Sequence, residues 1–388
     1  MGGKEYMKKN SFFNLYFDII LLFPIFTLFQ TFFSYINQVF VFLLVIVQIF
    51  LMSTNKVKIK NWCIIFVTFL LEISALYFTT GTIYNLNTIF YFPFFILFFT
   101  LITDYKNKVK LYLINRINYI HFIIIIWTLL VGISIFLPMS YVTGWGGAKY
   151  FGSYTGTIFR LGPTAVFVCS LIILYRLIKK KKCSFLYFLI PLYSFFMGGS
   201  RTYLVLGVSL LFIYLYLSLS KKTFLISIIP ILIIIVFFIF NSSMADKIES
   251  TIGSNYYGGV LGALSNGRTY FWVEDIKAFY GTSLFNRLFG NGFNFVYDVN
   301  LKTMNSLIWA HNDFIQLLTT YGYFGLLIYC LTFFNLFKSV KKDIIFTIII
   351  IFIWFFNAMF NMFYTYFCSM LSFPILLLSY EIKNDLGD

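Results

Sequence analysis

The stretch TFLISIIPILIIIVFFIF, at residues 223–240, has no charged side chain, and a long polar segment at residues 241–313 follows it directly. An apolar helix of about this length crosses a bilayer core of about 30 Å, because each residue adds about 1.5 Å. The stretch therefore predicts a transmembrane helix, and the segment after it predicts a large loop outside the membrane.

The rest of the chain repeats this apolar pattern. Of its 388 residues, 60% are hydrophobic and only 11% are charged, whereas soluble domains carry roughly 25% charged residues. We predict an all-α polytopic membrane protein of about twelve transmembrane helices, with one large extracytoplasmic loop between the ninth and the tenth. The predicted spans are at about residues 15–33, 36–52, 62–79, 86–102, 119–137, 158–178, 184–197, 202–219, 223–240, 322–337, 344–360 and 363–380.

The basic residues predict the orientation of these spans. Lysine and arginine are enriched in cytoplasmic loops, and 21 of the 29 basic residues fall in the tails and in alternate connections. Both termini are therefore expected in the cytoplasm. The organisation that follows is spans one to nine at residues 1–240, an extracytoplasmic loop at 241–313, and spans ten to twelve at 314–388.

The net charge of +15 is explained by these cytoplasmic loops, and the bilayer is the expected environment. No glycine-rich phosphate loop, RNA-binding signature or zinc spacing accompanies the charge, so a nucleic-acid partner is not expected. The outer carboxylates form no spaced set with histidines, so neither a metal site nor a cofactor is expected.

Three arginines on the predicted outer side are candidate ligands for phosphate. Arg160 lies just inside the end of one span, Arg201 follows a Gly-Gly-Ser turn, and Arg268 follows Asn-Gly in the long loop. A guanidinium group offers a flat bidentate fork for a phosphate. The alternatives are snorkelling toward lipid phosphates for Arg160 and Arg201, and a solvated loop position for Arg268.

His311 is the candidate catalytic residue, because it lies in the one long loop and next to Asn312 and Asp313. A lone histidine is more often structural, and that reading is the one we expect for His121 at the cytoplasmic entry of a span. Asn312, Asp313 and Tyr270 are candidates for supporting roles. Glu72 lies inside a predicted span and faces the interior of the bundle or a functional cavity.

Gly199-Ser200-Arg201-Thr202 opens a span, Gly267-Arg268 stands in the large loop, and HNDFIQLL at residues 311–318 leads to Gly322 and Gly325. This constellation resembles the O-antigen ligase/polymerase superfamily, which includes Wzy-type polymerases of O-antigen and capsule. FRLGP at 159–163 matches the family's arginine segment loosely, since the asparagine of that segment is missing.

The resemblance implies a GT-C-like fold and an inverting, metal-independent glycosyltransferase of the bacterial cytoplasmic (inner) membrane, with its active site outside. Its substrates would be oligosaccharides on undecaprenyl diphosphate, as donor and as acceptor, and a chain-length regulator is a further expected partner. His311 would be the general base. Arg201 and Arg268, with Arg160, would hold the diphosphate.

The expected function is polymerisation of lipopolysaccharide O-antigen or capsule repeat units. One alternative is a ligase that transfers finished polysaccharide to lipid A core or another acceptor. The other is a lipid-linked sugar flippase, against which stands the lack of a two-fold repeat and of paired broken helices.

Overall fold

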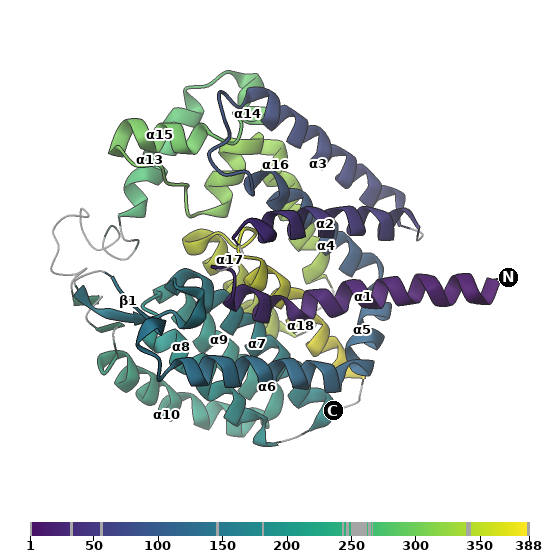
Figure 1. Cartoon of the computed structure of the whole chain (residues 1–388), viewed down its shortest axis with the longest axis vertical. Coiled ribbons are helices and arrows are strands. Elements are labelled where there is room, and N and C mark those ends of the chain that lie inside the picture. The colour runs from purple at the N-terminus through teal and green to yellow at the C-terminus, as the bar shows by residue number, and fades with distance from the viewer. Residues whose placement is uncertain are drawn as a thin grey trace.

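The computed structural model describes residues 2–31, 34–54, 57–144, 147–180, 182–242, 244–245, 248–249, 262, 265, 267–338 and 343–385. The described part is mainly α-helical (Figure 1). Its strands are β1 (Tyr141–Thr143) and β2 (Lys149–Phe151), which pair antiparallel as a hairpin in the connection between two helices.

Each predicted span overlaps one helix of the structure. These helices are α1 (Gly2–Leu28), α2 (Ser34–Ser53), α3 (Ile59–Phe78), α4 (Thr88–Asp104), α6 (Ile117–Ser134), α7 (Ile158–Lys179), α8 (Leu189–Met197), α9 (Arg201–Ser218), α10 (Lys221–Phe240), α16 (Asp313–Phe337), α17 (Ile344–Asn361) and α18 (Phe367–Asp385). A 3-10 helix, Lys182–Phe188, occupies the first part of the seventh predicted span.

Local capping explains where several of these helices begin. Ser220 accepts a hydrogen bond from the amide of Thr223 at the start of α10, and Asp343 accepts one from the amide of Phe346 at the start of α17. Each side chain thus satisfies one of the amides that the first turn leaves without a helical partner.

Seven of the described helices are long and apolar enough to cross a membrane, judged by length and composition. The number is eight if α4 and α5 (Lys106–Asn115), which meet at an angle of 86°, are one bent span. Three shorter apolar helical stretches, Phe12–Leu28, Val39–Ser53 and Ser184–Met197, fall below that length. The chain is thus an all-α membrane protein, and twelve spans remain a prediction.

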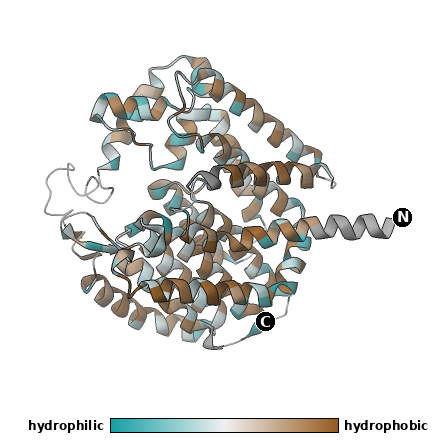
Figure 2. Ribbon diagram, viewed as in Figure 1, coloured by the Kyte–Doolittle hydropathy of each residue, from teal (hydrophilic) through white to brown (hydrophobic). Residues whose placement is uncertain are grey.

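Helix α7 forms the centre of the bundle, with 89% of the residues in its apolar stretch buried. It packs against α18, α9, α1 and α6. Helix α10 is the opposite case, because only 11% of its residues are buried although it is the most apolar of the candidate spans. Figure 2 shows brown, apolar ribbon on the outermost helices, which is the pattern that contact with lipid requires.

The polar segment after α10 forms a separate small unit. It contains α13 (Arg268–Tyr280), α14 (Leu284–Phe289) and α15 (Phe295–Met304). Phe271 and Trp272 of α13, Val296 of α15, and Ala310 and Ile315 form a second apolar core there. Figure 1 shows this unit and β1 at the end of the bundle away from both termini.

A glycine break in α16 joins this unit to the bundle. Gly322 has φ 69° and ψ −166°, which interrupts the helix, and the carbonyls of Thr319 and Thr320 then accept the amides of Asn291 (2.8 Å) and Gly292 (3.4 Å). Gly290 has φ 97°, and a Cβ there would overlap the backbone of Thr320. The part of α16 from this break onward corresponds to the tenth predicted span, at residues 322–337.

Replacement of Gly290 by alanine should destabilise the protein strongly, because the new Cβ meets backbone rather than a movable side chain. Gly81→Ala is the matched control, since Gly81 also has positive φ (69°) but nothing lies within 4 Å of its Cβ position. We expect Gly81→Ala to cost about 1–2 kcal/mol and Gly290→Ala to cost about 1–3 kcal/mol more. Thermal unfolding in detergent measures both, and equal losses would contradict the close contact.

Candidate active site

The first turns of α7 and α9 bring Arg160 and Arg201 to the same end of the bundle. The helices pack so closely that a Cβ on Gly162 would overlap the ring of Tyr203. The turn before Arg201 is tight, as the sequence predicts, because Gly199 has φ 64° and a Cβ there would overlap the ring of Tyr150. Only glycine fits such a position without strain.

Arg268 is the first residue of α13, and it reaches this end of the bundle from the outer unit. Its Nη1 donates a hydrogen bond to the carbonyl oxygen of Phe360, at the end of α17. Burial lowers the pKa of its guanidinium, and the like charge of Arg201 acts in the same direction. Two arginines more than sixty residues apart in sequence therefore interact through space.

His311 lies in the short turn that leads into α16, with a positive φ of 50°. The preceding residue is fixed from two sides. The carbonyl of Ala310 accepts the indole Nε1–H of Trp272 (2.6 Å), and its amide donates to Oε1 of Gln316 (3.3 Å). These contacts hold His311 in a backbone conformation that non-glycine residues seldom adopt.

The imidazole of His311 is neutral in this setting. Burial of the ring, together with the nearby charge of Arg268, lowers the pKa of His311 to about 3. Its Nδ1 is buried and has no hydrogen-bond partner in the described part of the chain. A neutral ring with a free nitrogen can accept a proton, which is what a general base requires.

Asn312 and Asp313 fix the helix that begins after the histidine. Asn312 caps α16 by accepting the amide of Ile315 (3.2 Å). Asp313 is fully buried, and its carboxylate accepts the hydroxyl of Tyr329 and the amide of Tyr364 (3.3 Å). Both residues thus position the segment that carries His311.

Tyr366 and Arg268 together link the four predicted polar residues. Its phenol interacts electrostatically with the guanidinium groups of Arg268 and Arg160, and Arg268 acts in turn on Arg201 and His311. No described carboxylate forms an ion pair with Arg160 or Arg268. Within the described residues, the charges of Arg160 and Arg268 are therefore not neutralised by a carboxylate.

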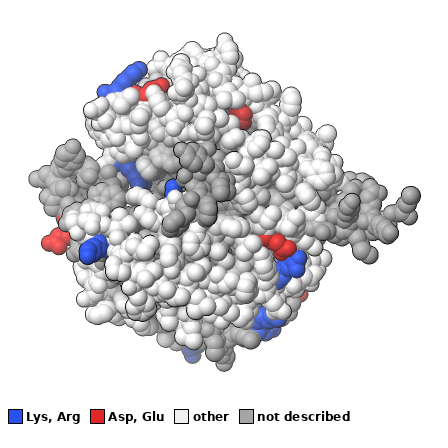
Figure 3. Space-filling model, viewed as in Figure 1, with Lys and Arg blue, Asp and Glu red and all other residues white. Residues whose placement is uncertain are grey.

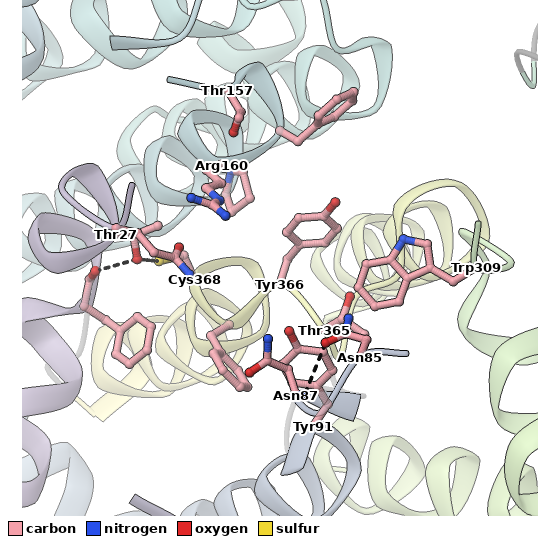
Figure 4. Close-up of a pocket in the computed structure, with 15 residues that line it drawn as sticks. Thr27, Asn85, Asn87, Tyr91, Thr157, Arg160, Trp309, Thr365, Tyr366 and Cys368 are labelled. Carbon is pink, nitrogen blue, oxygen red and sulfur yellow. Dashed lines mark hydrogen bonds between the residues drawn. The ribbon is translucent and has the colours of Figure 1, made fainter. Parts of the chain in front are cut away.

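A cavity of about 390 Å³ adjoins the cluster and is lined by Arg160, Tyr366 and Trp309 among others. In Figure 4 Tyr366 lies between Arg160 on one side and Trp309 on the other. The ring of Trp309 stands edge-on to that of His311, with 6.2 Å between the centroids. Figure 3 shows the hollow between the two lobes of the molecule, with basic atoms at its floor.

The remaining candidates lie elsewhere. Tyr270 is 59% exposed on α13, and its supporting role stays a prediction. The buried Glu72 accepts the hydroxyl of Tyr321 (2.8 Å), which ties α3 to α16 next to the glycine break. His121 stacks on Tyr175 and hydrogen-bonds Tyr187, as expected of a structural histidine. Among the described residues, no three His, Cys, Asp or Glu side chains are placed to share a metal ion.

Two site residues were not predicted from the sequence. Tyr366 lies between α17 and α18, where one tyrosine among 29 carries no distinguishing pattern. Trp272 was not among the candidates, and its indole holds the backbone beside His311 by its hydrogen bond to the Ala310 carbonyl. Its place at the fifth position of the helix that Arg268 opens is the only signal that could have indicated a link to the site.

Residues 186–330 match the family model described as O-antigen ligase. The match covers Arg201, Arg268 and His311 and ends within α16. The match relates this region of the chain to the O-antigen ligase/polymerase superfamily, whose members are glycosyltransferase-like enzymes. A comparison with curated proteins finds no match to the chain.

The buried Asp275 of α13 makes the outer unit sensitive to pH. Burial raises the pKa of Asp275 to about 7, while its contact with Asn300 opposes the shift and the charge of Glu274 adds to it. Because the folded-state pKa lies above the unfolded value of 3.8, Asp275 stays protonated up to a higher pH in the folded protein than in the unfolded chain. Stability is therefore full below about pH 4 and falls as the pH rises toward about 7.

Asp275→Asn should remove this loss, because asparagine is neutral at every pH. We expect the variant to unfold a few degrees higher than wild type at about pH 8 and at nearly the same temperature below about pH 4, where Asp275 is protonated in both the folded and the unfolded state. Asp298→Asn, in the same outer unit, is the control and should give no gain at the higher pH. A variant that gains nothing at about pH 8 would show that Asp275 is ionised at no cost in the folded protein.

Proposed function

We propose that this protein polymerises the repeat units of a bacterial surface polysaccharide, O-antigen or capsule. The observation that supports this function best is the electrostatic interaction of Arg268 with both Arg201 and His311, and of Tyr366 with both Arg268 and Arg160. Three cations suit a diphosphate, and one neutral imidazole suits proton abstraction from a sugar hydroxyl. The donor and the acceptor would both be oligosaccharides linked to undecaprenyl diphosphate.

The proposed reaction is a single displacement. His311 takes the proton of an acceptor hydroxyl, and that oxygen attacks the anomeric carbon of the donor sugar. The bond between this carbon and the diphosphate oxygen breaks, and undecaprenyl diphosphate leaves with the electron pair. Arg201 and Arg268, assisted by Arg160, stabilise the charge that develops on the leaving group. One displacement inverts the anomeric configuration and needs neither a metal nor a cofactor.

The proposal includes a place for the reaction. The distribution of basic residues predicts both termini in the cytoplasm, so the site would face the outside of the bacterial cytoplasmic membrane. The lipid-linked substrates are confined to this membrane. Substrates would enter from the bilayer, and a chain-length regulator would act as a partner.

A ligase is the second candidate, because the matching family model is itself described as O-antigen ligase. The same cluster serves either reaction, since both use a lipid diphosphate as the leaving group. The difference lies in the acceptor, which is another lipid-linked repeat unit for a polymerase and lipid A core or a similar molecule for a ligase.

A deletion strain complemented with variants tests the proposal and separates the two candidates. We expect His311→Ala to lower chain extension by about 10²–10⁴-fold and Arg268→Ala by about 10²–10³-fold, with Arg201→Ala similar. His121→Ala and Arg116→Ala are the matched controls, because His121 packs on Tyr175 and Arg116 pairs with Asp18 (2.9 Å), away from the cluster.

The readout of this experiment is the length of surface polysaccharide on a gel. Single repeat units attached to the acceptor would indicate a lost polymerase, and long chains left on undecaprenyl diphosphate would indicate a lost ligase. Normal ladders from all three variants would contradict the assigned roles. Lipid-linked units retained on the inner leaflet would point to a flippase instead.

The pH dependence of the purified enzyme tests the role of His311 separately. The acid limb of kcat/KM reports the base in the free enzyme, and the pKa of His311 there is about 3. We therefore expect kcat/KM for extracted lipid-linked units to stay flat from about pH 7 down to about pH 5, where an ordinary histidine would already be protonated. A limb near pH 6.5 that persists in Asp275→Asn would contradict the neutral, buried base.

A further inference from the structure

The cavity beside Arg160 carries polar groups that the protein itself does not satisfy. The side chains of Gln30 and Asn87 line it and form no hydrogen bond to a described residue. Thr157 also lines it, with its hydroxyl buried and unpartnered within the described part of the chain. Buried or half-buried polar groups normally have partners, so this set is arranged for a bound molecule.

The lining of the cavity indicates the chemistry of that molecule. Arg160 is the one charged side chain among its described lining residues, and the other polar groups are amides and hydroxyls. Aromatic rings of Trp309, Tyr91 and Tyr366 complete the wall. Amides that can both donate and accept match sugar hydroxyls, and flat rings match the apolar face of a pyranose.

The size and place of the cavity fit the same ligand. Its volume of about 390 Å³ is at the lower end of the range of about 300–1,000 Å³ for small-molecule sites. Trp309 borders both the cavity and His311, and Tyr366 faces both Arg160 and Arg268. A ligand in the cavity would therefore extend directly to the proposed base and to the phosphate-binding arginines.

We propose that this cavity is a sugar-binding subsite for the lipid-linked oligosaccharide, in which Gln30 and Asn87 recognise hydroxyl groups and Trp309 packs on the sugar ring. This inference rests on the proposed function and adds specificity-determining residues to it. The diphosphate contacts of Arg201 and Arg268 are the same for every repeat unit. Selection among sugars would fall to the cavity.

Asn87 is the residue to test, because its side chain has no structural duty in the described chain. It stands at the start of α4 without capping the helix. Its neighbour Asn85 is unsuitable, because Asn85 Oδ1 accepts the amide of Asn87 (3.1 Å) and so shapes the loop. Asn335 of α16, which lines a different cavity between α16 and α18, is the matched asparagine control.

Binding to purified full-length protein in detergent separates sugar from phosphate recognition. The probes are undecaprenyl diphosphate without sugar and the lipid-linked repeat units extracted from the deletion strain. We expect wild type to bind the sugar-bearing probe about tenfold more tightly. Asn87→Ala and Trp309→Ala should lose this gain and leave binding of the bare lipid unchanged. Asn335→Ala should behave as wild type, and Asn87→Gln should recover part of the gain.

The outcomes distinguish this inference from the proposed function. Equal binding of the two probes by wild type, or an undiminished gain in both Asn87→Ala and Trp309→Ala, would overturn the sugar subsite alone. Binding of neither probe by wild type would contradict the proposed function as well. If Asn87→Ala binds neither probe while Asn87→Gln binds both, Asn87 has a role in folding, and this result would also overturn the subsite.

Discussion

The interaction on which the site depends is the repulsion between the guanidinium groups of Arg201 and Arg268. Arginine stays protonated in proteins, so the fold must bring two fixed positive charges together and can relieve them only with hydrogen bonds or with an anion. The hydrogen bond from Arg268 to the Phe360 carbonyl is one such relief. Packing at Gly162 sets the helix that carries Arg201 against the helix that carries Arg160. Helix packing thus offsets the cost of holding two like charges close together. The resulting positive charge suits an anion such as the leaving diphosphate of the proposed reaction.

The second requirement is that a base stand beside these charges without being protonated by its surroundings. The break at Gly322 allows the first part of α16 to leave the direction of the span, and Asp313 anchors that part to Tyr329 and to the amide of Tyr364. His311 is therefore presented at a helix N-terminus, where the helix dipole also disfavours a positive charge. Position, burial and the charge of Arg268 all keep the imidazole neutral.

Much of this arrangement could be predicted from the sequence, and the rest depends on contacts that local pattern does not encode. Apolar runs located every long helix, since each run supplies its own backbone hydrogen bonds in a membrane. Residue type and turn signals singled out Arg201, Arg268 and His311 as candidates, and their roles remain predictions. Tyr366 was missed because its neighbours in space come from four different elements. The role of the loop at 290–292 was missed because its amides bond to carbonyls of α16 that lie 28 residues later in the chain. These carbonyls are free to accept because the helix breaks at Gly322, and the local sequence does not indicate that break.

The low pKa of His311, about 3, would make the imidazole a weak base if this value held during the proposed reaction. Linkage argues that it does not. Arg268 disfavours protonation of His311, and a bound diphosphate would cancel that charge, so anion binding and protonation favour each other reciprocally. In the proposed reaction, His311 would therefore become a stronger base when the diphosphate of the donor binds, and it would stay neutral before that because Arg268 disfavours its protonation. Coupling of this kind restricts proton transfer to complexes in which the leaving group is already held.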